Sequence, residues 1–296
     1  NGTGEKNVMI GHQAGYSTGG HNWTKNVGIG NEVLYKIQGG SENNVVIGNS
    51  AGYNSTTVTG NTLVGGEAGI AITTGDYNVA IGYQALLSTN SGGSNIAIGR
   101  LAGANNTTVG LNMYMGYAAG YGNQTGGYNT IIGNESYSQT AGIVNFTGVT
   151  TLGSEAGRYA TGSNNTFVGA DAGKGGTTSA PYSSGTHNTA LGRQALGGFT
   201  TGGSNTAIGS QAGNSIKTGT ENAFLGYNAG YNATGSMSYG VVIGSHAGYQ
   251  NNIGSTVYVG RYAGYAGSGH IGYGNIGIGY HALFTNSSTD VEGMKW

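Results

Sequence analysis

The chain of 296 residues has no cysteine, a single proline (Pro181) and only 21 charged side chains, 10 basic and 11 acidic. Without cysteine it cannot be a disulfide-stabilised scaffold or bind zinc or iron–sulfur clusters through thiolates. Ten scattered cations cannot neutralise a phosphate backbone, so we expect no nucleic-acid partner. No run of 18 apolar residues occurs, and we therefore expect no insertion of this segment into a membrane.

Residues that carry catalysis or bind metals are also scarce. The sequence has no His-Glu-x-x-His motif, no Gly-Lys-Ser/Thr phosphate loop and no nucleophile elbow. His246 and His281 share a repeat position but lie two repeats apart, too far to hold one metal. We therefore predict a protein that is not an enzyme and has no cofactor and no metal. Acidic residues that share one turn position could chelate a cation or, as we expect, form a solvated corner: Glu32, Glu67, Glu135, Glu155 and Asp171.

Glycine, in contrast, is abundant, with 63 residues where about 7% would be usual. The glycines follow a repeat of the form Asn-β-x-φ-Gly-x-x-Ala-Gly-Tyr, in which β is mostly β-branched and φ is Ile, Val, Leu or Met. Sixteen copies can be aligned, usually 17 residues apart, on the central glycines Gly11, Gly30, Gly48, Gly65, Gly82, Gly99, Gly116, Gly133, Gly153, Gly169, Gly192, Gly209, Gly226, Gly244, Gly260 and Gly279.

A unit this short and this rich in glycine predicts strands and tight corners rather than helical hairpins. One such coil cannot bury its own apolar face, but stacked coils can, so we predict an all-β parallel solenoid of about 16 coils of about 17 residues. At about 4.8 Å per coil the rod would be roughly 75 Å long. We expect the repeated asparagines to form a hydrogen-bonded ladder and the repeated alanines to fill a narrow corner. Residues 1–284 are predicted to form one continuous domain, and 285–296 a C-terminal cap or the start of another element.

The three-residue strand before each central glycine is apolar on both faces. We predict that its first and third residues point into the solenoid and that its middle residue points outward. So long an apolar stripe would be covered by other copies of the chain, in a side-by-side homo-oligomer, or by a second layer of the same coil. The predicted oligomer interface is Met9, Val46, Leu63, Ala80, Ala97, Tyr114, Ile131, Phe167, Ala190, Ala207, Phe224, Val242 and Tyr258.

Tyrosine often stands five residues after the central glycine, where the rings could bind sugars or proteins, or could pack on the ring of the next coil. Breaks in the repeat, including the link around Trp23 and the 23-residue spacing that holds Pro181, are the other places where we expect a ligand. The candidate ligand-binding residues are Tyr16, Tyr53, Tyr121, Tyr231, Tyr249, Tyr265, Trp23, Pro181 and Tyr182.

Segments such as Asn78–Leu86, Asn95–Gly103 and Asn205–Gly213 resemble the head repeats of trimeric autotransporter adhesins and repeats of bacteriophage tail fibres. The resemblance implies a left-handed β-roll, a homotrimer, and attachment to a surface glycan or protein receptor. The chain lacks the heptad stalk and the β-barrel anchor of such adhesins. We therefore expect an extracellular adhesive fibre segment, on a cell or a virion surface.

Two other functions are compatible with the sequence. The first repeat begins almost at once, at Asn7, so an upstream domain or end-to-end stacking of rods is expected, and stacking alone would make a structural filament without a specific receptor. Flat repetitive faces can also order water, as in ice-binding proteins. However, the threonines that would suit this role (Thr130, Thr150, Thr166, Thr189 and Thr206) lie on the predicted inward face.

Overall fold

The structure is a computed structural model that describes residues 4–17, 19–20, 22–139, 144–176, 182–233, 237–250, 254–265 and 274–284. These residues belong to two compact units, Asn1–Val149 and Thr150–Trp296, which we describe separately. The predicted C-terminal element at 285–296 lies outside the described residues. Whether 1–284 behaves as one continuous domain stays a prediction.

The described residues form sixteen strands of three residues each, usually about 17 residues apart, and no helix. The strands of the first unit are β1 (Val8–Ile10), β2 (Val27–Ile29), β3 (Val45–Ile47), β4 (Thr62–Val64), β5 (Val79–Ile81), β6 (Ile96–Ile98), β7 (Met113–Met115) and β8 (Thr130–Ile132). Those of the second unit are β9 (Thr150–Leu152), β10 (Thr166–Val168), β11 (Thr189–Leu191), β12 (Thr206–Ile208), β13 (Ala223–Leu225), β14 (Val241–Ile243), β15 (Val257–Val259) and β16 (Ile276–Ile278).

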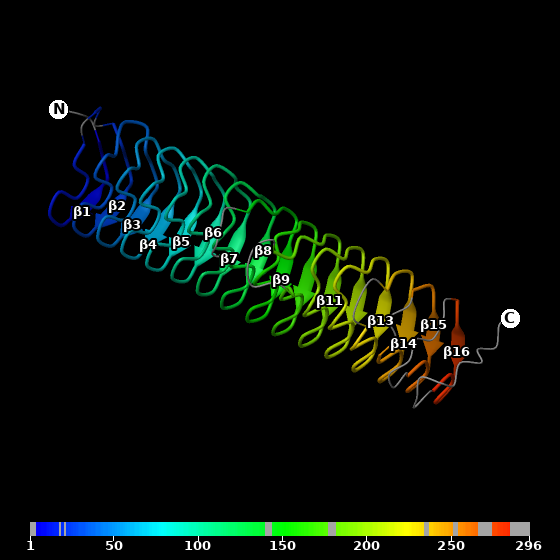
Figure 1. Cartoon of the computed structure of the whole chain (residues 1–296). Helices are drawn as coiled ribbons and strands as arrows, with labels where there is room; N and C mark the ends of the chain where they lie inside the picture. The colour runs from blue at the N-terminus through cyan, green and yellow to red at the C-terminus, as the bar shows by residue number, and fades with distance from the viewer. Residues whose placement is uncertain are drawn as a thin grey trace. The chain divides into compact units, whose positions relative to one another are not determined.

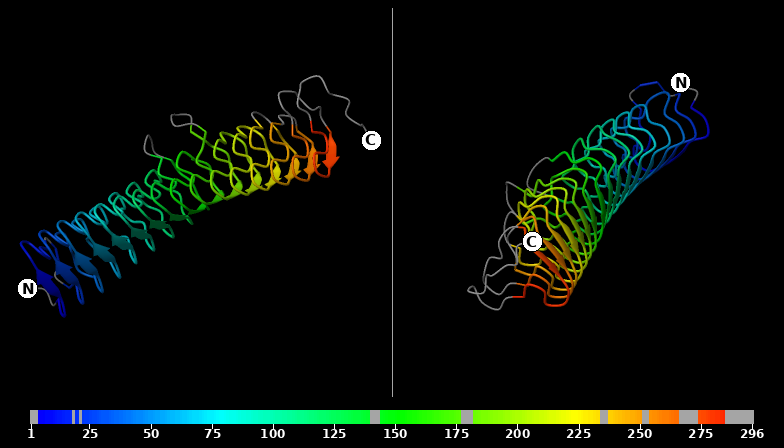
Figure 2. Two further views of the ribbon diagram at one scale, coloured as in Figure 1. Left: turned by 90° about the horizontal axis from the view of Figure 1, so that it is seen from below. Right: turned by 90° about the vertical axis from the view of Figure 1, so that its right-hand side faces the viewer.

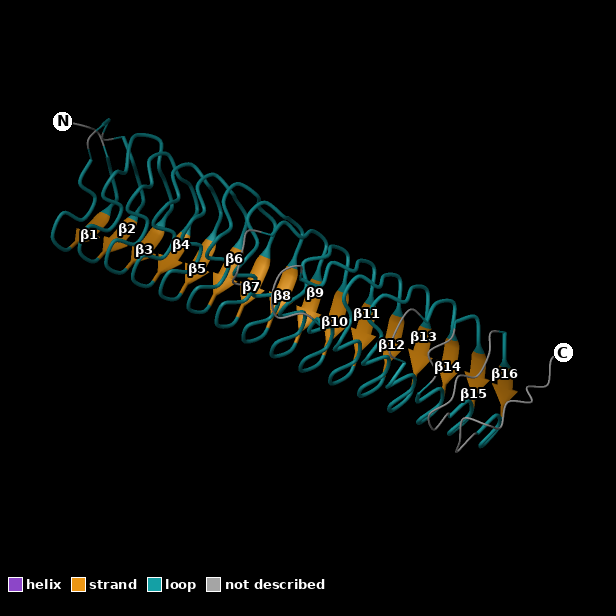
Figure 3. Cartoon of the chain, in the orientation of Figure 1, coloured by secondary structure: helices purple, strands orange, loops and turns teal. Residues whose placement is uncertain are grey.

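Within each unit every strand pairs in parallel with the next one along the chain, in register, as Val79 with Ile96 and Ile81 with Ile98. Figure 1 and the two views of Figure 2 show one strand per coil, with successive coils stacked in chain order. Figure 3 shows the strands in a row on one side of each unit, with turns and loops closing each coil. The predicted parallel β-solenoid is confirmed.

The central glycines are required by the stacking of the backbone. Each has φ between +122° and +150°, a conformation that residues with a side chain rarely adopt. Within each unit, a Cβ atom added to any central glycine except the last would also lie within 3 Å of the carbonyl group of the next central glycine. At Gly82, for example, it would be 2.7 Å from the carbonyl oxygen of Gly99. Both the conformation and the space therefore exclude any other residue.

The asparagines four residues before the central glycines form the predicted ladder. Asn78 Oδ1 accepts hydrogen bonds from the backbone N–H and from Nδ2 of Asn95, at 3.0 and 3.1 Å, while Asn78 Nδ2 donates to the carbonyl of Gly92 at 2.9 Å. The ladder tolerates the exceptions Val149 and Gly240, because each still donates its backbone N–H to the preceding asparagine. These buried amides satisfy backbone groups that water cannot reach.

The predicted orientation of the strands is wrong. The middle residue of each strand points into the solenoid and is buried under its own chain from β2 to β16, while Met9 in β1 is half-buried. The residues predicted as the oligomer interface therefore lie inside the solenoid, fully buried in every case except the half-buried Met9: Met9, Val46, Leu63, Ala80, Ala97, Tyr114, Ile131, Phe167, Ala190, Ala207, Phe224, Val242 and Tyr258. The outer positions are the first and third residues of each strand, because the coil is too narrow to bury more than one side chain per strand.

Packing inside the coil explains why four copies have leucine where most have glycine, four residues after the central glycine. A Cβ atom at Gly120 would lie 2.3 Å from the Tyr114 ring, so an aromatic strand centre leaves no space for a side chain there. Where the strand centre is glycine or alanine, leucine can fill the space. All four leucine coils follow this rule: Gly28 with Leu34, Ala80 with Leu86, Ala190 with Leu196, and Gly277 with Leu283.

Candidate interaction surfaces

The outward-facing side of the strands is an apolar surface. The third residue of every strand is Ile, Val, Leu or Met, and each is exposed or half-buried. Ile81, for example, is 38% exposed and Leu152 53%. We call this surface the outer sheet face and define it as the first and third residues of the strands. Along the eight strands of one unit it extends about 34 Å, and it includes no charged side chain.

The two units differ in the first residue of their strands. In the first unit this residue is aliphatic in five strands, methionine in β7 and threonine in β4 and β8. In the second unit four consecutive strands begin with an exposed threonine: Thr150, Thr166, Thr189 and Thr206. The outer sheet face of the second unit therefore carries a row of hydroxyl and methyl groups beside a row of aliphatic side chains.

The tyrosines five residues after the central glycine stack on one another. Tyr16, Tyr35 and Tyr53 have ring centroids 4.9 and 4.7 Å apart. In the second unit a longer stack, which we call the aromatic stack, has neighbouring centroids 5.2 to 5.4 Å apart and comprises Tyr231, Tyr249, Tyr265 and Phe284. Partial burial and, after it, the neighbouring tyrosines raise the pKa of Tyr249. A ring inside such a stack presents only its edge and hydroxyl group to a ligand, because both faces are covered.

The other candidate ligand residues do not converge on one place. Trp23 is half-buried in the first unit, where its ring lies beside Gly15. Tyr121 and Tyr182 are each half-buried in different coils. Pro181 lies outside the described residues. The candidate set predicted from the sequence is therefore spread over both units.

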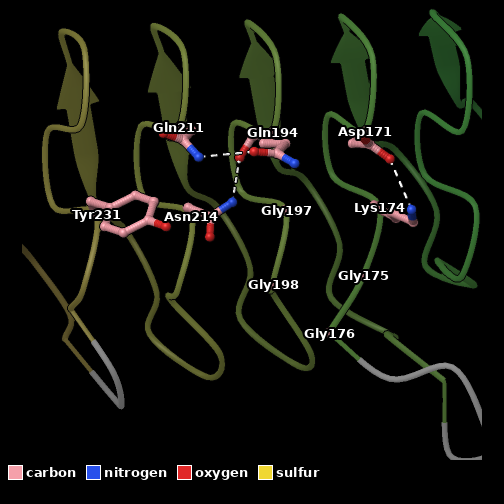
Figure 4. Close-up of a pocket in the computed structure, with 10 residues that line it drawn as sticks. All are labelled: Asp171, Lys174, Gly175, Gly176, Gln194, Gly197, Gly198, Gln211, Asn214 and Tyr231. Carbon is pink, nitrogen blue, oxygen red and sulfur yellow. Dashed lines mark hydrogen bonds and ion pairs between the residues drawn. The ribbon is translucent and has the colours of Figure 1, made fainter.

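The second unit has a hollow beside Tyr231, where the preceding coils carry Lys174, Gly197 and Asn214 in place of an aromatic ring (Figure 4). Its volume is about 380 Å³, within the range of small-molecule sites. The floor is backbone, formed by Gly175, Gly176, Gly197 and Gly198. The walls are the side chains of Asp171, Lys174, Gln194, Gln211, Asn214 and Tyr231.

The charged side chains at one end of the hollow form ion pairs with one another. Lys174 Nζ lies 2.9 Å from Asp171 Oδ1 and 2.6 Å from Glu155 Oε2, and Arg158 lies 3.0 Å from Glu155. The hydrogen bond from Lys174 lowers the pKa of Glu155. Partial burial acts to lower the pKa of Lys174, but its bonds to the two carboxylates prevail and raise it. The acidic turn position thus serves ion pairing here.

Two features were missed in the sequence. Tyrosines directly after the central glycine are well exposed, at 40 to 67%: Tyr83, Tyr117, Tyr227 and Tyr280. The hollow was missed as well, although its cause is visible in the repeat, since Gly197 stands where other coils have a larger residue. Alignment of the copies could have found these tyrosines and marked Gly197 as unusual, but it would not have shown the hollow itself.

In the part of the chain that the structure describes, no three His, Asp or Glu side chains are grouped so that they could hold a metal ion. Over the same residues, no helix long and apolar enough to cross a bilayer is found. No protein-family model, no curated protein and no solved structure matches this chain.

Proposed function

We propose that this chain is a self-associating segment of an extracellular attachment fibre, with a binding role rather than an enzymatic one. Copies would lie side by side with their outer sheet faces in contact. The homotrimer and the attachment role are those implied by the resemblance to adhesin heads and tail fibres. In this proposal the interface consists of the first and third strand residues, and not of the middle residues proposed from the sequence alone.

The observation that supports the proposal best is the apolar outer sheet face. The exposed side of a sheet normally carries polar residues, and contiguous apolar patches of more than a few hundred Å² mark interaction sites. The strands of every copy have the same spacing. The aliphatic side chains on the outer sheet face of one copy can therefore pack against those of a second, parallel copy. A second copy is therefore a well-matched occupant of this face.

Single cysteines introduced into this cysteine-free chain test the proposal. We expect the thiol of an Ile81→Cys variant to react slowly with a maleimide and to give covalent dimers with a short bis-maleimide. The matched variant Ser91→Cys, at an exposed loop position of the next coil, should react rapidly and give few dimers. The proposal fails if the two variants react equally fast and neither is cross-linked.

An alternative is a structural filament in which the rods stack end to end without a specific receptor. Strand edges at the two ends of a parallel sheet can pair with another chain. Electron microscopy separates the two proposals, because end-to-end stacking predicts long filaments of the purified chain, whereas side-by-side association predicts particles of one length.

A second candidate function, binding to ice, gains support from the orientation of the threonines. Thr150, Thr166, Thr189 and Thr206 are exposed on adjacent strands about 4.8 Å apart, rather than inside the solenoid as expected from the sequence. Such a regular row of hydroxyl and methyl groups can order water. Thermal hysteresis of the purified chain that disappears in a Thr166→Lys/Thr189→Lys variant would favour this function. If no thermal hysteresis is found, self-association is the function proposed for this face.

A further inference from the structure

We propose that the hollow beside Tyr231 is a binding site for an uncharged carbohydrate, one or two pyranose units of a glycan. This inference rests on the proposed attachment function, for which it names the chemical class of receptor. It is carried by the geometry of the hollow, and it does not depend on how many copies of the chain associate.

Tyr231 supplies an aromatic face. It is the first ring of the aromatic stack, and Tyr249 covers one of its faces at a centroid distance of 5.4 Å. On the side of the hollow, the preceding coils carry Asn214 and Gly197 at the same repeat position, in place of a ring (Figure 4). The C–H face of a pyranose can pack on such a ring, as other flat ligands do.

The amide side chains of the hollow can form hydrogen bonds with the hydroxyl groups of a sugar. Gln211 Nε2 donates to Gln194 Oε1 at 2.9 Å, and Asn214 Nδ2 donates to the carbonyl oxygen of Gln194 at 2.8 Å. Within the described residues this leaves Asn214 Oδ1 as an acceptor and Gln194 Nε2 as a donor. Amides offer both donors and acceptors, and sugar hydroxyl groups need both.

The charges of the hollow argue against an ionic ligand. Lys174 is its cation, and two carboxylates, from Asp171 and Glu155, already hold it within 3 Å. An anionic sugar would have to displace these carboxylates, and a cationic ligand would meet the ammonium group. The uncharged amides and the tyrosine are therefore the groups left to bind a ligand.

Gly197 keeps the hollow open, and the other floor glycines have a different role. Cβ atoms at Gly176 and Gly198 would lie 2.3 and 2.7 Å from backbone oxygens of the next coil, so stacking alone requires these glycines. At Gly197, in contrast, the nearest atom would be Asn214 Nδ2, the end of a side chain that can move. A larger residue is thus compatible with the fold there, and its absence makes room for a ligand.

The test is an array of neutral, sialylated and sulfated oligosaccharides, followed by calorimetric titration of the best neutral oligosaccharide. We expect neutral binding that falls at least about tenfold in Gly197→Tyr, which fills the hollow, and in Tyr231→Ala, which removes the stacking ring. The matched controls Leu87→Tyr and Tyr35→Ala change the same repeat position in the first unit. They should bind as the unaltered chain does.

The proposal is overturned if no neutral oligosaccharide binds, if only anionic ones bind, or if Gly197→Tyr and Tyr231→Ala bind like their controls. Circular dichroism of each variant shows whether it folds, and the two variants act by different means, so misfolding of one leaves the other as a test. The native mass of the same samples reports separately on self-association. Sugar binding by a monomer would refute the proposed assembly and leave this site intact.

Discussion

At the scale of single residues, two backbone requirements explain most of the unusual composition. The central glycines combine a φ that excludes side chains with a carbonyl contact that leaves no space for a Cβ atom. The asparagines bind backbone groups that would otherwise be buried without partners. Both requirements recur in most coils, which is why these residues could be predicted from the sequence alone.

Substitution of a central glycine should therefore be far more costly than substitution of an exposed one. We expect Gly82→Ala to lower the free energy of unfolding by about 3–5 kcal/mol, from backbone strain together with steric overlap with Gly99. Gly20→Ala is the control, since its Cβ atom would meet nothing within 4 Å, and it should change stability by less than about 0.5 kcal/mol. Urea titration measures both, and equal stabilities would contradict the structure.

The asparagine ladder makes a similar prediction. Asn78→Ala would leave the backbone N–H of Asn95 and the carbonyl of Gly92, both buried, without their partner. We expect a loss of about 2–4 kcal/mol. Asn90→Ala, at an exposed position, should cost much less. A small effect of Asn78→Ala in the same urea titration would mean that water replaces the amide.

At the scale of the element, each strand is one layer of a narrow core. Alternation along the strand predicts two sets of side chains but cannot say which set is inside when both are apolar. That is why the predicted orientation of the strands was wrong. The pairing of a small strand centre with leucine, as in Gly28 with Leu34, was a signal in the sequence that could have shown that the centre points inward.

This compensation can be measured with a double-mutant cycle at Ala80 and Leu86. Ala80→Phe alone should destabilise by overpacking, and Leu86→Gly alone by leaving a cavity. The double variant recreates the combination of Phe224 with Gly230, so it should be more stable than the sum of the two single effects by about 1–3 kcal/mol. Additive effects would show that the two side chains do not share space.

The ion pairs beside the hollow predict a pH dependence. The pKa of Glu155 is lower in the folded chain than its ordinary 4.5, so its stabilising effect is present above that pH. It should be lost as the pH falls through the lowered value. Thermal unfolding between pH 6 and pH 3 should therefore show a steeper decline for the unaltered chain than for Glu155→Gln. Parallel curves would contradict the pairing with Lys174.

At the scale of the whole molecule, the repeat alone predicts the solenoid, the number of coils and the position of each strand. The repeat does not predict the hollow, because whether the missing side chain at Gly197 leaves an open space depends on how the side chains of neighbouring coils pack. It also does not settle the partner of the outer sheet face, since the repeat specifies the face and not what covers it.

Charge on the outer sheet face should prevent association. We expect Ile81→Glu to dissociate the assembly, because each copy would bring a carboxylate into an apolar contact. Ser91→Glu adds the same charge at an exposed loop position and should leave the assembly intact. Sedimentation velocity compares the two, and equal sedimentation coefficients would argue against contact through this face.

The most direct test of the assembly is the native mass of the unaltered chain, measured by light scattering over a range of concentrations. A chain of 29.7 kDa whose outer sheet face is covered by other copies should give three times that mass, constant on dilution to micromolar concentration. A mass of one chain at every concentration would show that the face is exposed to water, and the proposed fibre would have to be abandoned.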